Sequence, residues 1–494
     1  MPGGNGGSFS AYSSSSGNRN GFGAARKASM ISCSEAGMLT GPAYRGRGRL
    51  GVAVYPLCSM VRLPPSVQIG PQGPMRGTLK VPGSKSITNR ALIAAALADG
   101  TSVVDGALIA EDSEVMIRAL AQLGVAVEAR GTSVVVRGAG GPPPATEADL
   151  DLRLSGTSIR FVTALVALGH GRFRLDGNAR MRQRPIQDLL DALRELGANA
   201  GTDDDNGCPP VTVHAAGLNG GTARIHGGRS SQYLSALLLA APYADRPVRL
   251  EVVGELQSKP FVDMTIDLMS AFGVPVEREG YRSFVVRPGR YRARAYQVEG
   301  DAMAAGYFWA AAAVTGGRVR VTNLGRKTRQ GDARLASVLE TMGCQVRWSE
   351  EASEVQGPRG GRLRGDLDLD LNDMPDQAQT LAVVALFADG PVRIANVGNL
   401  RIKETDRISA IAHELERLGA MVEEEDDAFT VHPLGAAPSA PVALDTYGDH
   451  RMAMALAVAG ARIPNVVIKD PGCVSKTYPR FFDDFLTLLA GTLS

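Results

Sequence analysis

The 494-residue chain has few of the residues that build covalent cross-links or metal sites. Its five Cys are odd in number and scattered, and none of them forms a CxxC pair. Its six His are also dispersed and show no HExxH spacing. The sequence therefore predicts neither a disulfide framework nor a zinc finger.

Long apolar runs and an excess of one charge are missing as well. We find no uninterrupted apolar stretch of the roughly 18 residues that would cross a bilayer, so no membrane span is predicted. The formal net charge of +2 argues against a dedicated nucleic-acid binder. The 58 Gly show no collagen period, and 44% apolar with 21% charged residues is ordinary globular usage.

The first 66 residues differ from the rest of the chain. They contain seven Lys or Arg but one acid, Glu35, and they are rich in Gly and Ser. Such a segment buries too little apolar surface to offset the entropy of ordering, so we expect residues 1–66 to be a disordered or non-native extension. Two alternatives stay open, namely an organelle transit peptide and a true start at Met60 or Met75.

Six stretches of the chain share one pattern, a polar turn followed by an apolar run that suits a buried helix. Their turns are marked by Ser84, Gly156, Ser231, Asp301, Asp376 and Asp449, which lie 72, 75, 70, 75 and 73 residues apart. This narrow spread predicts six copies of one unit. Solenoid repeats of the ankyrin or TPR type are much shorter, about 33 residues, and fit less well.

The unit is predicted to contain a helix, a strand, a second helix and a pair of strands. A β-like segment follows each apolar run, as in VRLEVVG at residues 248–254. The second helix is amphipathic, so it should lie outside, and it ends at a Gly that tolerates positive φ. These Gly are Gly124, Gly197, Gly273, Gly343 and Gly419. Six units, about 430 residues, exceed one core, so we expect two α/β domains of three units each.

The polar turns collect basic side chains. Helix N-termini carry unpaired N–H groups and partial positive charge, so converging N-termini form an anion site. These turns and the RMRQRP, LQSKP, NLRIKETDR and CVSKTYP segments offer Lys85, Arg90, Arg160, Arg180, Arg182, Arg184, Lys259, Lys403, Arg407, Arg451 and Lys476. We expect Lys403 and Arg407 one helical turn apart on one face. Together these residues predict a site for small, multiply anionic ligands.

Each motif alone has a structural alternative. GSKS at residues 83–86 lacks the Gly spacing of a P-loop, so a nucleotide loop is not predicted. The Ser-Ser-Gln motif that begins at Ser230 could only cap a helix. Glu404 could belong to a solvated charge run, Asp376 could be a helix cap, and Cys473 is read as a small buried residue. Their corresponding places in six repeats favour a shared site.

Nine motifs between Gly77 and Phe482 carry a specific resemblance to a known family. They are KVPGSKSITNRALI, ARMRQRPI, SSQYLSALL, SKPFVDMT, EGDAMAAGYF, DMPDQAQTLA, NLRIKETDRI, TYGDHRMAMAL and DPGCVSKTYPRF. Over about residues 67–490 the chain resembles the 5-enolpyruvylshikimate-3-phosphate synthase family. These are the 3-phosphoshikimate 1-carboxyvinyltransferases of the shikimate pathway, which leads to chorismate and the aromatic amino acids.

The resemblance implies a fold of two inside-out α/β domains, each of three repeats with buried parallel helices and outer sheets. The chain would cross between the domains near Gly83 and near Gly300. The first globular domain would hold residues 67–83 and 301–494, and the second would hold residues 84–300. The cleft between them would close on the substrates.

The resemblance also implies the reaction. The enolpyruvyl group of phosphoenolpyruvate is transferred to the 5-hydroxyl of shikimate 3-phosphate, and phosphate is released, by addition and elimination through a tetrahedral intermediate. Asp376 would take the hydroxyl proton, and Glu404, with Lys85, would protonate C3 of the enol. Because nearby cations favour a charged carboxylate, Glu404 needs an opposing influence to act as an acid, which the sequence does not reveal.

The implied ligands of each substrate are read from matching positions. Shikimate 3-phosphate would contact Lys85, Ser86, Arg90, Ser230, Ser231, Gln232, Ser258, Asp376, Asn399 and Lys403. Phosphoenolpyruvate would contact Lys85, Gly156, Arg184, Gln232, Arg407, Arg451 and Lys476. The herbicide glyphosate, an anion that takes the place of phosphoenolpyruvate in this family, should bind beside Gly156. No metal or organic cofactor, nucleic acid or membrane is implied. The chain is expected to be a cytoplasmic monomer, or plastidic if residues 1–66 are a transit peptide.

Some positions depart from the family pattern. Leu154 stands where the family has Asn, and Phe161 stands where many members have Pro. Asp301 is followed by Ala and Met rather than Ser, and Phe261 takes the place of an aromatic hydroxyl. These changes leave the shape of the enolpyruvyl pocket open.

Two other functions are weighed against this reading. The sister transferase that acts on UDP-N-acetylglucosamine carries a catalytic Cys in an Arg-flanked loop, whereas Cys208 lies in a DDDNGCPP hairpin. A non-catalytic anion-binding repeat protein would be expected to have lost Asp376, Glu404 or Lys85, and all three are present. Both alternatives are therefore disfavoured.

Overall fold

The computed structural model describes residues 63–491. The predicted extension up to residue 62, including a start at Met60, lies outside the described residues. The predicted boundary at residue 66 is too late, because Leu63 packs against the core and Ser66 already pairs with Lys469. Composition alone could not place this boundary, since the partner strand lies near the other end of the chain.

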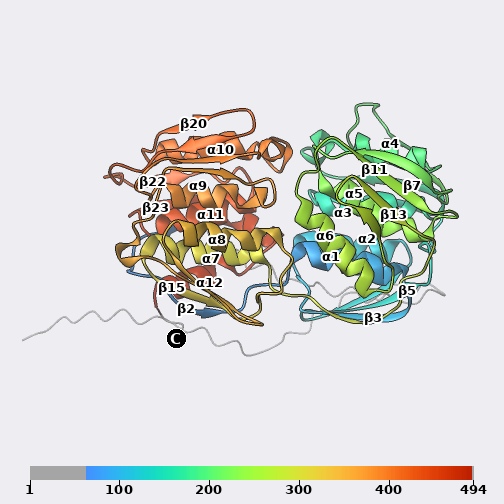
Figure 1. The fold of residues 1–494 in the computed structure, drawn as a ribbon, viewed down its shortest axis with the longest axis horizontal. Coiled ribbons are helices and arrows are strands. Elements are labelled where there is room, and N and C mark those ends of the chain that lie inside the picture. The colour runs from blue at the N-terminus through green and yellow to red at the C-terminus, as the bar shows by residue number, and fades with distance from the viewer. Residues whose placement is uncertain (1–62, 492–494) are drawn as a thin grey trace, which may run out of the picture. The chain divides into compact units, whose positions relative to one another are not determined.

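Two hydrophobic cores divide the described residues. One is built from residues 87–298, and the other from residues 69–81 together with residues 302–489. We call the two parts the 84–300 lobe and the 301–491 lobe. In each lobe the helices are enclosed by the sheets, which is the inside-out α/β arrangement (Figure 1).

Six buried helices, three to a lobe, confirm the predicted repeat. They are α1 (Lys85–Leu97), α3 (Gly156–Ala167), α5 (Ser231–Ala240), α7 (Ala302–Thr315), α9 (Ala378–Ala385) and α11 (His450–Gly460). Each begins within two residues of its predicted marker. Helix α7 shows why these helices are buried, because Ala, Phe, Trp and Tyr side chains cover it on all sides.

The second helix of each of the first five units also ends as predicted. These helices are α2 (Glu111–Gln122), α4 (Gln187–Glu195), α6 (Lys259–Ala271), α8 (Leu335–Thr341) and α10 (Arg407–Arg417). The Gly that follows each one has a positive φ, from 87° at Gly124 to 104° at Gly343. In the sixth unit the corresponding segment is a 3-10 turn, η7 (Pro471–Lys476), followed by α12 (Phe481–Leu489).

The predicted unit lacks one strand. Around four of the six buried helices, the strand before the helix pairs in parallel with the strand after it, as β6 (Glu147–Asp151) does with β7 (His170–Asp176) around α3. The strands that lead into α1 and α7 are exchanged, because the strand before α1 pairs in parallel with the strand after α7, and the strand before α7 with the strand after α1. A parallel pair needs such a crossover, and the buried helix supplies it. The unit is therefore strand, helix, strand, helix and two strands. The leading strands are only three to six residues long, which hides them in the sequence.

Six sheets cover the helices in the described part of the chain. In the 84–300 lobe the strand orders are β14-β3-β5-β4, β6-β7-β9-β8 and β10-β11-β13-β12. The strands not yet given are β3 (Asp99–Asp105), β4 (Ala126–Arg130), β5 (Ser133–Ala139), β8 (Asn199–Thr202), β9 (Val211–Ala216), β10 (Gly221–His226), β11 (Val248–Val253), β12 (Glu277–Glu279), β13 (Ser283–Val286) and β14 (Ala295–Gln297).

In the 301–491 lobe the strand orders are β16-β17-β15-β2, β18-β19-β21-β20 and β1-β23-β22. The strands are β1 (Ser66–Ile69), β2 (Arg76–Leu79), β15 (Arg318–Val321), β16 (Gln345–Trp348), β17 (Ser353–Gln356), β18 (Leu367–Asp370), β19 (Val392–Ala395), β20 (Val422–Glu424), β21 (Phe429–Val431), β22 (Val442–Leu444) and β23 (Val466–Lys469). Strands β1 and β2 precede the other lobe in sequence, yet they complete sheets of this one.

The chain passes between the lobes at two adjacent points. Gly83 and Gly300 form an antiparallel bridge, and the N–H of Asp301 donates to the carbonyl of Pro82 at 2.9 Å. Gly83 is required here, because a Cβ would lie 1.8 Å from the carbonyl oxygen of Gly106. This double crossing brings the N-termini of α1 and α7 together.

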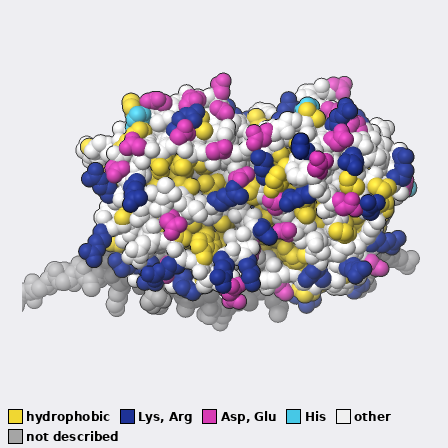
Figure 2. All heavy atoms as spheres, viewed as in Figure 1, with side chains coloured by type: hydrophobic (Ala, Val, Ile, Leu, Met, Phe, Trp, Pro, Cys, Tyr) yellow, Lys and Arg dark blue, Asp and Glu magenta, His cyan; other side chains and the backbone are white. Residues whose placement is uncertain are grey.

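The surface carries both signs of charge. On the face shown in Figure 2, Lys and Arg are interspersed with Asp and Glu. Within residues 63–491, no helix is both long and apolar enough to cross a membrane. The same residues contain no group of three or more His, Cys, Asp or Glu placed to hold a metal ion.

Candidate active site

A cluster of three carboxylates around one arginine lies at the helix starts of the 301–491 lobe. Arg407, the first residue of α10, is 1% exposed. Its Nε donates to Asp449 at 2.7 Å, its Nη1 to Asp376 at 3.0 Å and its Nη2 to Glu404 at 2.8 Å. Arg451, on the first turn of α11, donates to the other oxygen of Asp376 at 2.8 Å. The sequence motifs that contain these residues are thus brought together.

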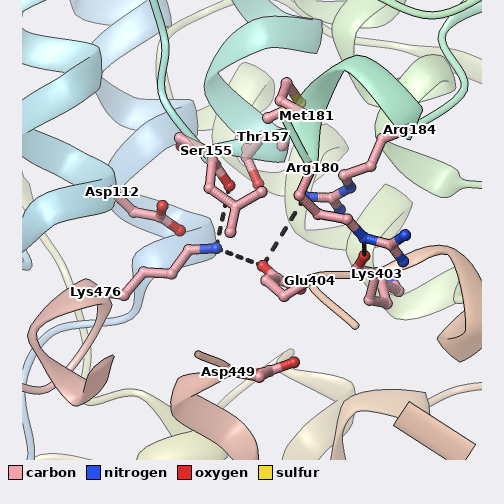
Figure 3. A network of polar contacts seen from close by, with 12 residues as sticks. Asp112, Ser155, Thr157, Arg180, Met181, Arg184, Lys403, Glu404, Asp449 and Lys476 are labelled. Atoms are coloured by element: carbon pink, nitrogen blue, oxygen red, sulfur yellow. Dashed lines mark hydrogen bonds and ion pairs between the residues drawn. The ribbon is translucent and has the colours of Figure 1, made fainter. Parts of the chain in front are cut away.

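The cluster extends across to the 84–300 lobe through Glu404 (Figure 3). Lys476 Nζ donates to Glu404 Oε1 at 2.5 Å and to the carbonyl of Leu154, in the other lobe, at 3.1 Å. Arg184 Nη1 lies 3.9 Å from the same Glu404 oxygen. Cations of both lobes therefore converge on one carboxylate.

Arg184 is incompletely paired. It is 4% exposed, yet its Nε and Nη1 have no hydrogen-bond acceptor within the described residues. A buried donor without an acceptor is costly, and native structures rarely contain one without a reason. An anion bound between the lobes would supply the missing acceptor.

The cations hold the two nearest carboxylates in their charged forms. Burial alone would raise the pKa of Asp376, but Arg451, Lys403 and other cations hold it well below its usual value. Burial would likewise raise the pKa of Glu404, but Lys476 and Arg407 lower it well below the usual range. In the ligand-free protein both groups are therefore ionised at neutral pH.

Lys403 and Arg407 do not share a helix face, so that prediction is wrong. Lys403 follows the 3-10 turn η6 (Gly398–Ile402), and α10 begins only at Arg407. Asp406 caps α10, because its Oδ1 accepts from the N–H groups of Ile408 and Ser409. Burial lowers the pKa of Lys403 to about 8. Within the described residues its ammonium has no ion-pair or hydrogen-bond partner.

The start of α1 carries Lys85 and Ser86. Lys85 Nζ lies 3.3 Å from the carboxylate of Asp112, and its backbone N–H donates to Asp301 at 3.0 Å. Asp301 also caps α7 through the N–H groups of Met303 and Ala304. One carboxylate thus joins the starts of two helices from different lobes.

The guanidinium of Arg90 forms its hydrogen bonds inside its own lobe. It is 1% exposed, and its guanidinium donates to Thr265 at 2.7 Å, to Ser235 at 3.2 Å and to the carbonyl of Phe261 at 3.1 Å. These bonds fasten α1 to α5 and α6. Burial lowers its pKa to about 9. Its direct contact with a substrate stays a prediction.

The start of α5 carries the Ser-Ser-Gln motif. Ser230 caps the helix, since its Oγ accepts from the N–H of Gln232 at 3.3 Å. Gln232 is held by Arg160, which donates to its Oε1 at 2.6 Å, and by a 3.3 Å bond from its Nε2 to Thr157. Ser231 is 5% exposed. The motif is therefore both a cap and an ordered polar surface at this helix start.

Two more predicted residues, Ser258 and Asn399, each form a hydrogen bond to the opposite lobe. Ser258 has left-handed backbone angles, φ 58° and ψ 47°, and its N–H donates to Asn372 of the other lobe at 3.0 Å. Asn399 donates to Gln257 at 3.3 Å, while its buried Oδ1 has no hydrogen-bond partner in the described part of the chain. Strain of this kind at a non-Gly residue clusters at functional sites.

Gly156 begins α3 directly beside Arg184. A Cβ at this position would lie 2.7 to 2.9 Å from the Arg184 guanidinium. The absence of a side chain here therefore lets Arg184 occupy its place. Of the departures from the family pattern, Leu154 uses its carbonyl to bind Lys476, and Phe161 packs under Arg90, 5.3 Å from the ring centre.

Three site residues were not predicted. Asp449 caps α11 and binds Arg407, whereas the sequence marks it only as the start of a repeat unit. Asp112 pairs with Lys85 but lies in an acidic turn that the repeat does not mark. Asp332 is 5% exposed, and burial together with Asp376 raises its pKa to about 7. No local sequence signal identifies the last two.

Comparison with known proteins adds an independent observation. The family model for EPSP synthase (3-phosphoshikimate 1-carboxyvinyltransferase) matches residues 69–485. The chain is 48% identical over 419 residues to a 3-phosphoshikimate 1-carboxyvinyltransferase from Nostoc punctiforme, which covers 84% of this chain and 97% of the relative. One from Ralstonia nicotianae is 47% identical over 429 residues, covering 85% and 98%. The solved EPSP synthase of Acinetobacter baumannii superposes with a TM-score of 0.69 at 26% identity, covering 86% and 98%.

Proposed function

The chain belongs to the EPSP synthase family, and from this premise we propose which of its residues carry out the family's reaction. It is an enolpyruvyl transferase that moves the enolpyruvyl group of phosphoenolpyruvate to shikimate 3-phosphate. The observation that carries the assignment of residues is the convergence of cations from both lobes on Glu404, beside Asp376, which pairs with Arg407 and Arg451.

Phosphoenolpyruvate binds among Lys85, Gly156, Arg184, Gln232, Arg407, Arg451 and Lys476 in this proposal. Its phosphate and carboxylate supply the acceptor that the buried Arg184 lacks. In the ligand-free protein, Glu404 holds Lys476, Arg407 and Arg184, so its carboxylate stands in for the substrate anion. When the anion binds, these three cations must interact with both Glu404 and the anion.

Shikimate 3-phosphate binds beside it, between the two lobes. Its ligands are Lys85, Ser86, Arg90, Ser230, Ser231, Gln232 and Ser258 on one side and Asp376, Asn399 and Lys403 on the other. Within residues 63–491 the ammonium of Lys403 has no ion-pair or hydrogen-bond partner and the buried Oδ1 of Asn399 has no hydrogen-bond partner, and both observations support this placement. The start of α5 adds N–H donors suited to a phosphate.

The reaction uses the two carboxylates as base and acid. Asp376 takes the proton of the 5-hydroxyl as its oxygen bonds to C2 of the enol, and Glu404 delivers a proton to C3, with Lys85 alongside. In the second step C3 returns its proton to Glu404, and the C3–H electron pair re-forms the double bond. The C2–O bond to phosphate breaks with its electron pair leaving on the phosphate, which takes up the proton held by Asp376. The tetrahedral adduct lies between the two steps.

Substrate binding supplies the influence that Glu404 needs to act as an acid. The cations that keep its pKa low become shared with the substrate's phosphate and carboxylate. The added negative charge disfavours an ionised Glu404 and raises its pKa toward a working range. The same exchange weakens the hold of Arg407 and Arg451 on Asp376, which makes it a better base.

The experiment measures phosphate release from phosphoenolpyruvate plus shikimate 3-phosphate. Asp376→Asn and Glu404→Gln should each lower kcat by ~10²–10⁴, the usual contribution of a positioned acid or base. The control is Asp373→Asn, since Asp373 pairs with Arg334 away from the cluster. A loss of less than about tenfold in either variant would show that its role is misassigned. UDP-N-acetylglucosamine as acceptor should give no turnover.

We further infer that the enzyme acts as a cytoplasmic monomer on free metabolites. Both substrates are small anions, and one chain supplies every proposed ligand, so no second copy is needed to complete the site. Sedimentation of the purified protein tests this, and a stable dimer would contradict it.

A further inference from the structure

Arg180 reaches from one lobe to the main chain of the other. It lies beside η1 (Met181–Gln183), in the segment that also holds Arg184. Its Nε donates to the carbonyl of Lys403 at 3.1 Å (Figure 3). Its Nη2 donates to the carbonyl of Arg401 at 3.5 Å. Its Nη1 donates to Gln183 at 3.1 Å, which steadies the guanidinium.

The carbonyl groups that accept from Arg180 lie in or beside a segment that has no regular secondary structure. Residues 403–406 separate η6 from α10 and have no regular secondary structure. The N–H of Lys403 has one long bond, 3.4 Å, to the carbonyl of Leu400. Helical hydrogen bonds therefore do not fix the peptide between Lys403 and Glu404. Arg180 holds its carbonyl oxygen from the opposite lobe.

Three arginines of one short segment have different partners. Arg184 faces Glu404, Arg180 binds main-chain carbonyls across the lobes, and Arg182 pairs with Asp176 of its own lobe at 2.7 Å. The Arg182 side chain is 54% exposed, so its pair is of the weak surface kind. Arg182 is therefore a matched control for Arg180.

We propose that Arg180 is a positioning residue that locks the segment carrying Arg184 to the loop carrying Lys403 and Glu404. When Arg180 binds the carbonyl of Lys403, Arg184 of one lobe and Glu404 of the other are held at the positions that the reaction needs. An arginine suits this task, because its planar fork serves several acceptors while a lysine offers a point charge. The proposal rests on the proposed function of Glu404.

The test compares Arg180→Met and Arg180→Lys with Arg182→Met in the full-length protein, using phosphate release. Arg180→Met should lower kcat by ~10–100-fold, since small misplacements of reacting groups are costly. Arg180→Lys should recover part of the loss, and added guanidinium ion should partly rescue Arg180→Met. Arg182→Met should match the native enzyme. A kcat for Arg180→Met within about twofold of native would overturn the proposal.

A second comparison separates positioning from general damage. Thermal unfolding without ligands should be unchanged by Arg180→Met, because the side chain is partly exposed and packs in neither core. In a Glu404→Gln background, Arg180→Met should cost much less in kcat than it costs in the native protein. An equal cost in both backgrounds would show that Arg180 does not act through Glu404. Full activity of Glu404→Gln alone would instead contradict the proposed role of Glu404 as the acid.

Discussion

At the scale of single residues, the main feature of the site is one guanidinium, that of Arg407, which donates hydrogen bonds to three carboxylates. Burying so many charges costs desolvation energy that their mutual attraction only partly offsets, so such a cluster is a poor device for stability. Although burial works to lower the pKa of Arg407, the three carboxylates raise it above its usual value. Function, rather than folding, explains why the charges are kept.

Gly156 gives the first prediction at this scale. In Gly156→Ala the new Cβ would lie within 3 Å of the Arg184 guanidinium and would displace it. We expect the KM for phosphoenolpyruvate to rise ~10–100-fold, the factor that matches ~1.5–3 kcal/mol for a hydrogen bond to a charged group. Inhibition by glyphosate should weaken further, because a longer anion tolerates a displaced wall less well.

The control for this change is Gly141→Ala. A Cβ at Gly141 would meet no atom within 4 Å, so steady-state kinetics should match the native enzyme. If Gly156→Ala left both the KM and glyphosate inhibition unchanged, Gly156 and Arg184 would not line the phosphoenolpyruvate site.

Lys403 gives a prediction about pH. Burial lowers its pKa to about 8, so the ammonium is charged below that pH and neutral above it. The KM for shikimate 3-phosphate should therefore rise as the pH passes upward through about 8, because the attraction between the ammonium and the anionic substrate is lost. Lys403→Arg stays charged and should show a flatter profile. A native KM that stayed constant between about pH 7 and pH 9.5 would contradict this placement of Lys403.

Motifs single out the proposed site residues, whose contacts with substrate stay a prediction, but the geometry of these residues could not be predicted. The spacing of Lys403 and Arg407 predicts one helix face, and the cap at Asp406 overrides that spacing by starting the helix later. Nothing in the sequence distinguishes Arg180 from Arg182, since both are basic residues of one short segment. Their partners are set by where the other lobe lies.

At the scale of elements, the buried helices could be predicted well because each carries its own signals. A polar turn, an apolar run and a later Gly are local features, and the starts of α3 and α5 agree with them to the residue. The exchanged strands have no local signal, because β14 pairs with β3 and β1 pairs with β23, far away in sequence. Only the family resemblance joins residues 67–83 to the 301–491 lobe. Short strands with distant partners leave little local pattern.

Strand β1 leads to a prediction about truncation. It pairs along its whole length with β23, and Ile69 is 1% exposed. A chain that starts at Met75 lacks β1 and loses about 2 kcal/mol for the Ile69 side chain alone. It should unfold at a lower temperature and lose activity, because β23 leads directly into η7, which carries Lys476.

A chain that starts at Met60 keeps every described residue and is the matched control. We expect its turnover and its unfolding temperature to equal those of the full chain. Loss of activity on removal of residues 1–59 would mean that this segment contributes to the enzyme, and an unaffected Met75 start would mean that β1 does not stabilise the lobe.

At the scale of the whole molecule, the site depends on both lobes and belongs to neither. Lys476 bonds to the carbonyl of Leu154, Arg180 to that of Lys403, and Arg184 faces Glu404, so each contact joins the two cores. Neither lobe alone supplies all the proposed ligands of the two substrates. Exchange of Glu404 for a substrate anion is therefore an event of the whole molecule, since it alters contacts on both sides at once.

Proton uptake on ligand binding tests this exchange most directly. Calorimetric titration near neutral pH, in buffers of different ionisation enthalpy, would add glyphosate as a non-reacting anion to the protein saturated with shikimate 3-phosphate. The native protein should take up more protons than Glu404→Gln, because the anion takes over the cations that hold the pKa of Glu404 low. Equal proton uptake by the two proteins would show that Glu404 stays ionised when the site fills, and would contradict its role as the acid.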